Sequence, residues 1–432
     1  MERFYLSITL SVLVLFSSFS LLAQSNASPD LFTRTGSKLT FVATTPDKGT
    51  ELWSSGGSTA TTAILKDINA GENSSIPMFF EWYAVRNVAN AKTFFMATDG
   101  VNGLSLWVTN GTLSGTRIAK DFTPDGSDAY FFIPAADSAY AYVELLSPDG
   151  GNSLLYKASA ATGTTTLMGE IPGQMSVGAL ANNEKFYYIA NLAPAGMGSF
   201  YLCIYNTKQG YVGNRCDHYF GDSFTDLHKT ADGFFIRTYN YDQIDPYGNN
   251  VKEDIYYFKY AANTPVFIGS YDASTFFPLA KAGNNAYFIA ENKLYKTNGT
   301  EAGTAPVMTF SGNVSSAVFA VMYNSLYFVA ENMLYKITDS YVNTLGEFSG
   351  VYEMISTNQT GPGTIYFTAQ GQDELWKTIG AAPVRILSDT TGGGIKDLIY
   401  HNSYLYFTDV SDSGSDRFWR STAALASIIK VW

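Results

Sequence analysis

The sequence predicts an all-β fold, and both its composition and its repeated apolar segments favour one. Of the 432 residues, 15% are aromatic and only 15% are charged, with 30 Tyr, 30 Phe and 38 Gly. An average globular chain has roughly 25% charged residues. Aromatic rings pack well on pleated sheets, and Gly supplies the tight turns between strands. This balance is therefore typical of many short strands joined by turns.

A unit of strand-length segments recurs about nine times along the chain. Each unit opens with an alternating apolar segment and continues with a second segment rich in Leu, Trp or Tyr. The sixth unit is the clearest, with Ala286–Ala290 followed by Leu294–Thr304. Strand-like segments between units, such as Met78–Tyr83 and Ala317–Met322, bring each unit to four strands. The opening segments of the nine units are Leu39–Ala43, Thr93–Ala97, Tyr140–Val143, Phe186–Ala190, Gly233–Arg237, Ala286–Ala290, Leu326–Ala330, Ile365–Ala369 and Leu405–Thr408.

Four short strands repeated about every 45 residues indicate the blades of a β-propeller. A lone four-stranded sheet cannot bury both faces, whereas blades stacked around an axis can. We therefore predict a single propeller over residues 28–432, with eight or nine blades, or seven if the degenerate units are misassigned. An open β-solenoid is the alternative, although its repeats are usually much shorter. Because strand-like residues Leu31–Arg34 precede the first unit, we expect them to close the ring by pairing with the last unit.

Residues 1–27 are predicted to be a secretory signal peptide. Arg3 precedes the apolar run Leu6–Leu22, and the small residues Ala23 and Ala27 bracket the expected cleavage site. This order predicts a protein of the periplasm, the cell surface or the medium. A retained membrane anchor is the alternative, because the run barely reaches spanning length. No second such run follows, so no membrane span is expected after cleavage.

The net charge of −11 argues against nucleic acid as a partner, because phosphates attract basic surfaces. Cys203 and Cys216 are the only cysteines, and export would place them in an oxidising compartment. If the chain turns at Gln209 and Gly210, the two cysteines face each other at a non-hydrogen-bonded position of a hairpin. Cα atoms approach to about 4.5 Å there, which is within disulfide range. We therefore predict a disulfide within one blade, with free thiols as the alternative.

One large aromatic residue recurs at the same place in the second segment of most units. Such rings could form a platform for sugars or fill the space between neighbouring blades, and one ring per unit at a fixed position favours packing. The pairs Asn110-Gly111 and Asn298-Gly299 suit tight turns, because Asn and Gly tolerate positive φ best. Turn geometry therefore explains them without a ligand. The recurring aromatic residues are Trp53, Trp107, Tyr156, Tyr295, Tyr335, Trp376 and Trp419.

These phrases resemble the ELWxxDGT-repeat family, over nearly the whole chain after the signal. The resemblance is carried by Glu51-Leu-Trp, by Leu106-Trp-Val-Thr-Asn-Gly-Thr, by the run Leu294–Thr304 and by Glu374-Leu-Trp-Lys-Thr. The Asp that the family has before Gly-Thr is Asn110 or Asn298 here, and Gly56 in the first copy. The resemblance implies a secreted or surface protein, mostly bacterial and often from Bacteroidetes, with a propeller fold. It implies no activity.

Titratable side chains are densest in the fourth and fifth units, where His218, Asp222, Asp226 and His228 lie close in sequence. A catalytic or metal site is one hypothesis for them, and ordinary strand and loop chemistry is the favoured one. The only other histidine is His401, and the three together show no metal-binding spacing. No nucleophile elbow, phosphate loop or dinucleotide fingerprint is present.

An acidic loop containing Asp409, Asp412 and Asp416 is the candidate for a cofactor, which would be Ca²⁺. Ca²⁺ takes six to eight oxygen ligands, and a Gly lies between the last two carboxylates. The loop does not match an EF-hand, so a solvated turn is favoured. The similar loop Asp125–Asp128 is interpreted in the same way.

From the sequence we expect a monomeric, secreted binding or adhesion module whose partner is a protein or a glycan. One alternative is an enzyme acting on polysaccharide with carboxylates at the channel mouth. Another is a surface-layer component with a broad exposed apolar patch. The fourth and fifth units are the expected place for function. They lack the repeated turn and contain both cysteines, two histidines and the longest insertion, Tyr239–Asp254.

Overall fold

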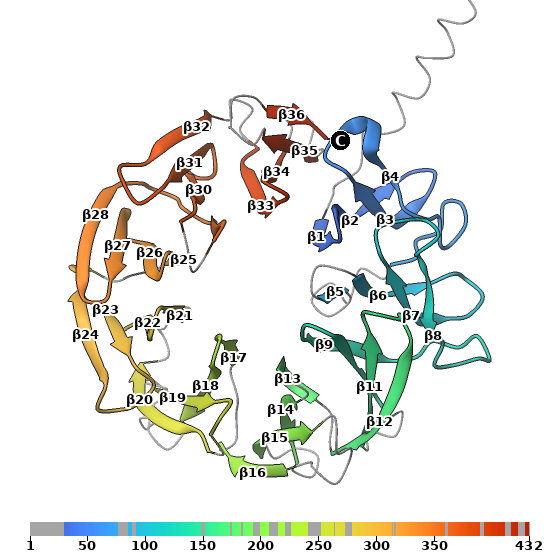
Figure 1. Ribbon diagram of the computed structural model, residues 1–432, viewed down its shortest axis with the longest axis horizontal. Helices are drawn as coiled ribbons and strands as arrows, with labels where there is room; N and C mark the ends of the chain where they lie inside the picture. The colour runs from blue at the N-terminus through green and yellow to red at the C-terminus, as the bar shows by residue number, and fades with distance from the viewer. Residues whose placement is uncertain are drawn as a thin grey trace, which may run out of the picture.

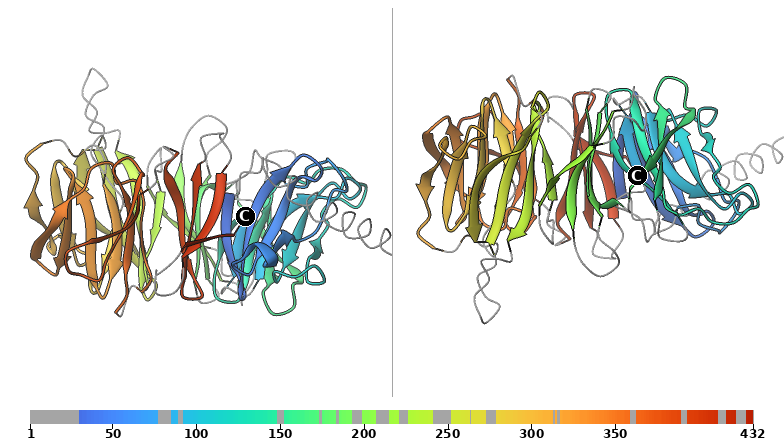
Figure 2. Two further views of the ribbon diagram at one scale, coloured as in Figure 1. Left: turned by 90° about the horizontal axis from the view of Figure 1, so that it is seen from above. Right: turned by 90° about the horizontal axis from the view of Figure 1, so that it is seen from below.

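The protein forms a ring of nine four-stranded antiparallel sheets in the computed structural model (Figure 1). The innermost strands surround the axis of the ring, which is the place of the central channel in β-propellers. In Figure 2 the ring is a disc whose strands run between its two faces. The predicted β-propeller is therefore confirmed, with nine blades, and the solenoid is excluded. The structure describes residues 30–76, 85–88, 92–147, 152–172, 175–182, 185–192, 199–206, 215–220, 226–240, 252–262, 264–272, 279–312, 314, 317–358, 362–388, 393–410, 416–421 and 428–431.

The blades, numbered one to nine along the chain, each consist of four consecutive strands. Blades one to three comprise β1 (Asp30–Thr35), β2 (Lys38–Thr45), β3 (Gly49–Ser55), β4 (Thr62–Ile64); β5 (Val85–Val88), β6 (Lys92–Thr98), β7 (Leu104–Thr109), β8 (Arg117–Lys120); and β9 (Phe131–Ala136), β10 (Tyr140–Leu145), β11 (Ser153–Ser159), β12 (Thr165–Ile171). Blades four to six comprise β13 (Met175–Asn182), β14 (Lys185–Asn191), β15 (Phe200–Asn206), β16 (Arg215–Tyr219); β17 (Asp226–Lys229), β18 (Gly233–Asn240), β19 (Lys252–Lys259), β20 (Val266–Asp272); and β21 (Ala280–Ala282), β22 (Asn285–Ala290), β23 (Lys293–Thr297), β24 (Thr304–Thr309). Blades seven to nine comprise β25 (Val318–Met322), β26 (Ser325–Ala330), β27 (Met333–Thr338), β28 (Tyr341–Glu347); β29 (Met354–Ser356), β30 (Ile365–Ala369), β31 (Glu374–Thr378), β32 (Val384–Ser388); and β33 (Ile395–His401), β34 (Tyr404–Val410), β35 (Asp416–Ser421), β36 (Ile428–Lys430).

The first strand of each blade lines the channel and the fourth lies at the rim (Figure 1). A short 3₁₀ helix, η1 (Thr59–Thr61), precedes β4. Within the described ranges, no helix is both long and apolar enough to cross a membrane. The strand expected at Met78–Tyr83 lies outside the described residues, and the inner strand of blade two is β5, at Val85–Val88. The strand expected at Ala317–Met322 is β25.

Ring closure differs from the prediction. Residues Leu31–Arg34 do not pair with the last unit, because they belong to β1, which pairs with β2 inside blade one. Blade nine already contains four strands of its own and needs none from the N-terminus. The two end blades instead pack face to face, with the ring of Phe32 4.8 Å from that of Phe418. Among the described residues, the two end blades share no strand, and they are joined by ring packing and by hydrogen bonds from Thr59 and Asn402 to the backbone carbonyls of Lys430 and Ser37.

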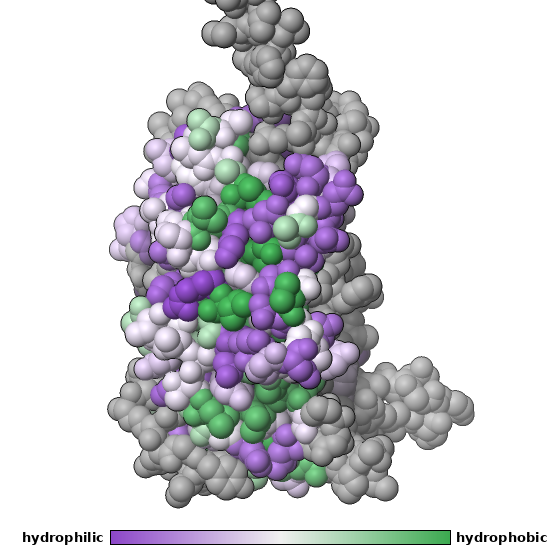
Figure 3. Space-filling model, turned by 90° about the vertical axis from the view of Figure 1, so that its right-hand side faces the viewer, coloured by the Kyte–Doolittle hydropathy of each residue, from purple (hydrophilic) through white to green (hydrophobic). Residues whose placement is uncertain are grey.

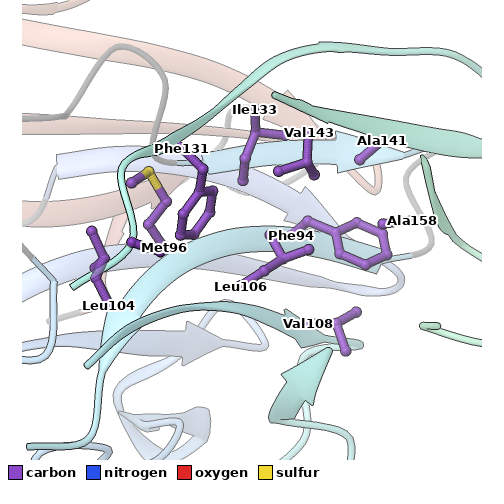
Figure 4. Close-up of a cluster of buried hydrophobic side chains, with 11 residues drawn as sticks. Phe94, Met96, Leu104, Leu106, Val108, Phe131, Ile133, Ala141, Val143 and Ala158 are labelled. Atoms are coloured by element: carbon purple, nitrogen blue, oxygen red, sulfur yellow. The ribbon is translucent and has the colours of Figure 1, made fainter. Parts of the chain in front are cut away.

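The core lies between blades rather than within them. Figure 4 shows one such interface, where Phe94, Met96 and Leu106 of blade two meet Phe131 and Val143 of blade three. In every blade, one residue of the second strand faces one of the third, and these pairs pack on the preceding blade. Two of the pairs are stacked rings, with centroids 5.2 Å apart for Phe288 and Tyr295 and 5.0 Å for Phe328 and Tyr335. The nine pairs are Phe41–Trp53, Phe95–Trp107, Val143–Tyr156, Tyr188–Cys203, Ile236–Tyr256, Phe288–Tyr295, Phe328–Tyr335, Phe367–Trp376 and Phe407–Trp419.

The seven aromatic residues singled out in the sequence all belong to these pairs. Trp107, the most buried of them, is 3% exposed and packs against Leu52, Leu65 and Ile76 of blade one and its connection to blade two. In blades two to eight, the register between the third and fourth strands shifts at a β-bulge. The shift falls immediately before the third-strand residue of the pair. Bulges increase local twist, so the same register shift recurs where each sheet bends around its neighbour.

Cys203 occupies the place that an aromatic ring holds in most blades, and it forms a disulfide with Cys216. The two residues are direct partners across β15 and β16, with their Cα atoms 4.1 Å apart. The predicted disulfide is present, and the register is the one expected from the sequence. The turn expected at Gln209 and Gly210 lies outside the described residues.

The repeated Asn-Gly phrase is a turn locked by its own side chains. The Oδ1 atom of Asn298 accepts hydrogen bonds from the backbone N–H of Thr300 at 3.1 Å and from its hydroxyl at 2.7 Å. Gly299 has a φ of 91°, and a Cβ there would lie 2.4 Å from the ring of Tyr257 in blade five. Gly303 has no room either, because its Cβ would lie 2.0 Å from Asn298 Oδ1. Turn geometry and contact with the neighbouring blade together explain the phrase.

A buried carboxyl group holds the connection between blades one and two. Glu51 is fully buried, and its oxygens accept hydrogen bonds from the N–H groups of Ile68 and Asn69 and from the Ser75 hydroxyl. Burial outweighs these hydrogen bonds and raises the pKa of Glu51 to about 7. Glu353 in the connection to blade eight accepts from the N–H of Leu398, and burial raises its pKa to about 7 as well.

Replacing both Cys203 and Cys216 with Ser should lower the free energy of unfolding by about 3 kcal/mol at most, because the sequence separation of 13 defines a short loop. Urea unfolding of the wild type with and without reductant measures the effect. The double variant should not respond to reductant. Equal stability of oxidised and reduced wild type would contradict this account.

Gly303→Ala should destabilise the protein by about 1–3 kcal/mol, because the new Cβ displaces Asn298 and breaks its hydrogen bonds. Gly312→Ala is the matched control, because the nearest atom to its Cβ would be 3.5 Å away. Thermal unfolding of both variants tests this difference. A Gly303→Ala variant as stable as the control would show that the Asn298 turn is not constrained as described.

Raising the pH from 5 to 8 should destabilise the protein through Glu51. Its pKa is about 7 when folded and 4.5 ordinarily, so the folded state holds the proton more tightly. The stabilisation is complete below pH 4.5 and is lost as pH rises through 7, at most roughly 3 kcal/mol. Glu51→Gln should reduce this dependence in urea unfolding without abolishing it, because Glu353 has a similarly raised pKa, whereas Glu347→Gln at an exposed position should leave it unchanged. Identical pH profiles for wild type and Glu51→Gln would contradict the prediction.

Candidate functional site

A cavity of about 680 Å³ opens on the channel wall at blades five, six and seven. Its wall is formed by the inner strands β17, β21 and β25, with the turns that follow them. Each of these strands begins at one face of the ring and ends at a hairpin turn on the other. The lining residues are His228, Lys229, Thr230, Ala231, Leu279, Ala280, Lys281, Gly283, Ala317, Val318, Phe319, Ala320, Val321, Asn324 and Tyr352.

Two adjacent inner strands of the cavity wall contain Ala at the position that faces a buried second-strand tyrosine. Ala280 is paired with Tyr287, and Ala320 is paired with Tyr327. At the same place opposite the equivalent tyrosine, blades four, eight and nine have Leu180, Ile355 and Ile399. Blade three has Ala135 opposite Tyr142, but neither neighbouring blade has Ala at this register. Replacing branched side chains with Ala in two adjacent blades leaves unfilled space between them. The sequence contains this signal, but it is visible only once the units are aligned on their inner strands.

The hairpin end of the cavity is cationic. Lys281 forms an ion pair with Asp232 in the turn after β17, and the Tyr257 hydroxyl donates to the same carboxylate at 2.8 Å. Burial opposes ionisation of Asp232, but the hydrogen bonds from Lys281 and Tyr257 prevail and hold its pKa below the usual value. Burial, together with Asp232, raises the pKa of Tyr257 to about 12, so this hydroxyl stays protonated. Lys281 and Tyr257 are therefore fixed in place at the cavity edge.

Lys229, the second ammonium group of this end, reaches across to blade four. Its Nζ donates to the backbone carbonyl of Ala181 at 2.8 Å, a neutral partner. Burial of part of the side chain lowers the pKa of Lys229, and the negative charge of Asp137 acts in the opposite direction. The residue as a whole is exposed to water. An ammonium group has three donors, so Lys229 can still donate to a ligand.

The structure separates the residues of the predicted titratable group. His228 lies on the inner strand β17 and lines the cavity, whereas His218 lies on β16, the rim strand of blade four. Asp226 begins β17, opposite Arg237. Asp222 lies outside the described residues. A site that uses His218 and His228 together is therefore not present, because one lies on a rim strand and the other on an inner strand.

The predicted acidic loop is described only in part. Both oxygens of Asp409 accept hydrogen bonds at 2.8 Å from the guanidinium of Arg417, and Oδ1 also accepts from the Trp419 indole. Asp416 begins β35, and Asp412 lies outside the described residues. Among the described residues, no group of three or more His, Cys, Asp or Glu is arranged to hold a metal ion.

His401 lies at the contact between blades nine and one, at the end of β33. It is 8% exposed, and burial together with the nearby Arg34 guanidinium lowers its pKa. This histidine belongs to the closure of the ring and is far from β17 in the ring order.

Asp125 and Asp128 stabilise turns. Asp125 accepts a hydrogen bond from the N–H of Ser127, and Asp128 accepts one from the N–H of Leu104.

The outer surface over blades one to three shows apolar residues dispersed among polar ones (Figure 3). Exposed large apolar residues on these blades are single positions on turns and rim strands, such as Val101, Leu113, Tyr130 and Leu167. Single exposed apolar side chains are normal for a protein surface. The channel-wall cavity is therefore the feature that stands out as a candidate site.

No protein-family profile and no curated protein matches the chain. A solved structure from a study of two prolyl endopeptidases superposes with a TM-score of 0.45 at 11% identity, covering 92% of this chain and 54% of that one. The β-propeller domain of the Trilobed protease from Pyrococcus furiosus, whose topology is described as open velcro, gives 0.47 at 11% identity, covering 94% and 98%. The dihydro-heme d1 dehydrogenase NirN gives 0.43 at 12%, covering 83% and 76%. This chain thus spans about half the length of the prolyl endopeptidase, and likenesses at this level carry no inference about ligand or reaction.

Proposed function

We propose that this protein is an exported binding module that holds its ligand in the channel-wall cavity of blades five to seven. The observation that carries the proposal is the cavity itself, at about 680 Å³, within the range of small-ligand sites. Its wall has Ala280 and Ala320 at the same register in two adjacent blades, where blades four, eight and nine have Leu or Ile. A rigid scaffold with one local departure is the usual arrangement for a recognition site.

The chemistry of the lining supports binding. The cavity combines apolar side chains such as Leu279 and Phe319 with a few polar groups, namely the lysines, His228 and Asn324. A largely apolar surface with a small number of placed polar groups fixes a ligand and its orientation. Its walls are preformed, because the blades behind them are buried against each other. A preformed site loses little conformational entropy on binding.

Export is supported by the sequence of residues 1–27 and by the disulfide between Cys203 and Cys216, which suits an oxidising compartment. Membership of the ELWxxDGT-repeat proteins is part of the same proposal and rests on the repeated phrases. Because the ring closes within one chain, we propose that the monomer is the functional unit.

The test compares wild type with a double variant, Ala280→Ile and Ala320→Ile. Blades eight and nine already contain Ile at this register, so the scaffold should accept the change. Thr33→Ile on the inner strand of blade one is the matched control. Small molecules retained by the purified protein are identified by mass spectrometry, and a glycan array screens for sugars.

We expect wild type and Thr33→Ile to retain the same ligands, and the double variant to bind them at least about tenfold more weakly. Thermal unfolding checks that all three proteins are folded. Ligands that stay bound to the double variant would place the site elsewhere. Release of reducing ends from a glycan incubated with wild type would contradict the proposal, because it would show that the protein is an enzyme that cleaves glycans.

A further inference from the structure

The cavity is polarised along its strands. Lys229 is the last residue of β17 and Lys281 is the second-last residue of β21, so both lie toward the hairpin turns. Leu279, Ala317 and Tyr352 lie before the start of an inner strand, toward the other face of the ring. One end is therefore cationic and the other apolar. His228 lies between them, on β17.

The cationic end has two ammonium groups, Lys229 and Lys281, and the carboxylates close to them are Asp137 and Asp232. Lys281 forms an ion pair with Asp232, whereas Lys229 donates its hydrogen bond to the neutral carbonyl of Ala181 and interacts with the Asp137 carboxylate through space. The whole chain has a net charge of −11, and these two ammonium groups, with three donors each, can still donate to an anion. Ammonium groups in a recessed wall attract anions and are screened less by salt than charge on an open surface.

The apolar end can take hydrocarbon. Leu279 is 4% exposed, and the ring of Phe319 packs edge-on against that of Phe328, with centroids 5.8 Å apart. Tyr352, which is 65% exposed, stands in the connection before β29. A ligand that covered Tyr352 and Phe319 would remove apolar surface from water at about 25 cal/mol per Å².

We propose that the cavity binds a small anionic amphiphile, with its charged head at Lys229 and Lys281 and its apolar part along Leu279, Phe319 and Tyr352. The inference rests on the proposed function, because it names the class of ligand for the same cavity. The head is a carboxylate, phosphate, sulfate or sulfonate, since all of these accept hydrogen bonds from ammonium groups. The apolar part is an aliphatic chain or a ring.

The test uses two fluorescent probes that differ in charge. The anionic probe is 1-anilinonaphthalene-8-sulfonate, and the neutral probe is N-phenyl-1-naphthylamine, which lacks the sulfonate. Lys229→Met removes the charge and keeps an apolar stem of similar length. Lys259→Met is the matched control, because Lys259 is exposed on β19 and does not line the cavity. Thermal unfolding shows that each variant is folded.

Lys229→Met should weaken binding of the anionic probe by roughly tenfold, because one charge-assisted hydrogen bond is lost. Binding of the neutral probe should not change. Lys259→Met should change neither. The inference is overturned if Lys229→Met leaves the anionic probe unchanged, or if wild type binds the neutral probe as tightly. In those cases the proposed function stands as long as the Ala280→Ile and Ala320→Ile variant loses the probes. If that variant keeps both probes, the proposed function itself fails.

Displacement of the anionic probe then identifies the head group. Decanoate, decyl phosphate and decyl sulfate are compared with decanol at equal concentration. Stronger displacement by any of the anions supports the inference, and the strongest competitor identifies the head. Equal displacement by decanol contradicts it. Affinity for the anions should also fall as NaCl is raised.

Discussion

Packing between neighbouring blades is the interaction on which the whole ring depends. The residues paired across the second and third strands, such as Phe288 and Tyr295, bury their rings against the preceding blade. A four-stranded sheet has no other partner for this face, so no blade is stable without its neighbours. Blade four shows how strict the constraint is. Where Cys203 replaces the ring, a disulfide to the rim strand holds the sheet instead.

Stability and recognition are assigned to different strands of the same blade. The third strands carry the aromatic residues of the scaffold, and the turns after them are locked by residues such as Asn298 and Thr300. The first strands face the channel and can change without exposing the core. Ala280 and Ala320 exploit this freedom, because their small side chains open a cavity while Tyr287 and Tyr327 behind them stay buried. The site is a departure from the repeat that leaves the contacts between blades intact.

Most of the fold follows from local pattern, and most of the site does not. The alternating segments and their spacing predict nine units, and a simple pairing rule predicts the partner of Cys203. The prediction that Leu31–Arg34 pair with the last unit is wrong. The inner strand of a complete blade and a strand that closes a ring show the same local pattern of residues, so the sequence does not distinguish them. His218 and His228 are close in the chain but lie at the rim and at the channel. The cavity depends on missing bulk at Ala280, and Lys229 meets Ala181 only through the tertiary fold. Neither the cavity nor this contact corresponds to a sequence motif.

The closure of the ring has a consequence for how such a protein can change. Blades one and nine are each built from one continuous stretch of chain, and they meet through Phe32, Phe41 and Phe418 rather than through shared hydrogen-bonded strands. Duplication or loss of one complete repeat would therefore require no rearrangement at the ends of the chain. The new neighbours would present to each other pairs of residues at the same register of the second and third strands. The number of blades is open to variation by recombination, whereas a ring closed by strand exchange ties its first and last repeats together.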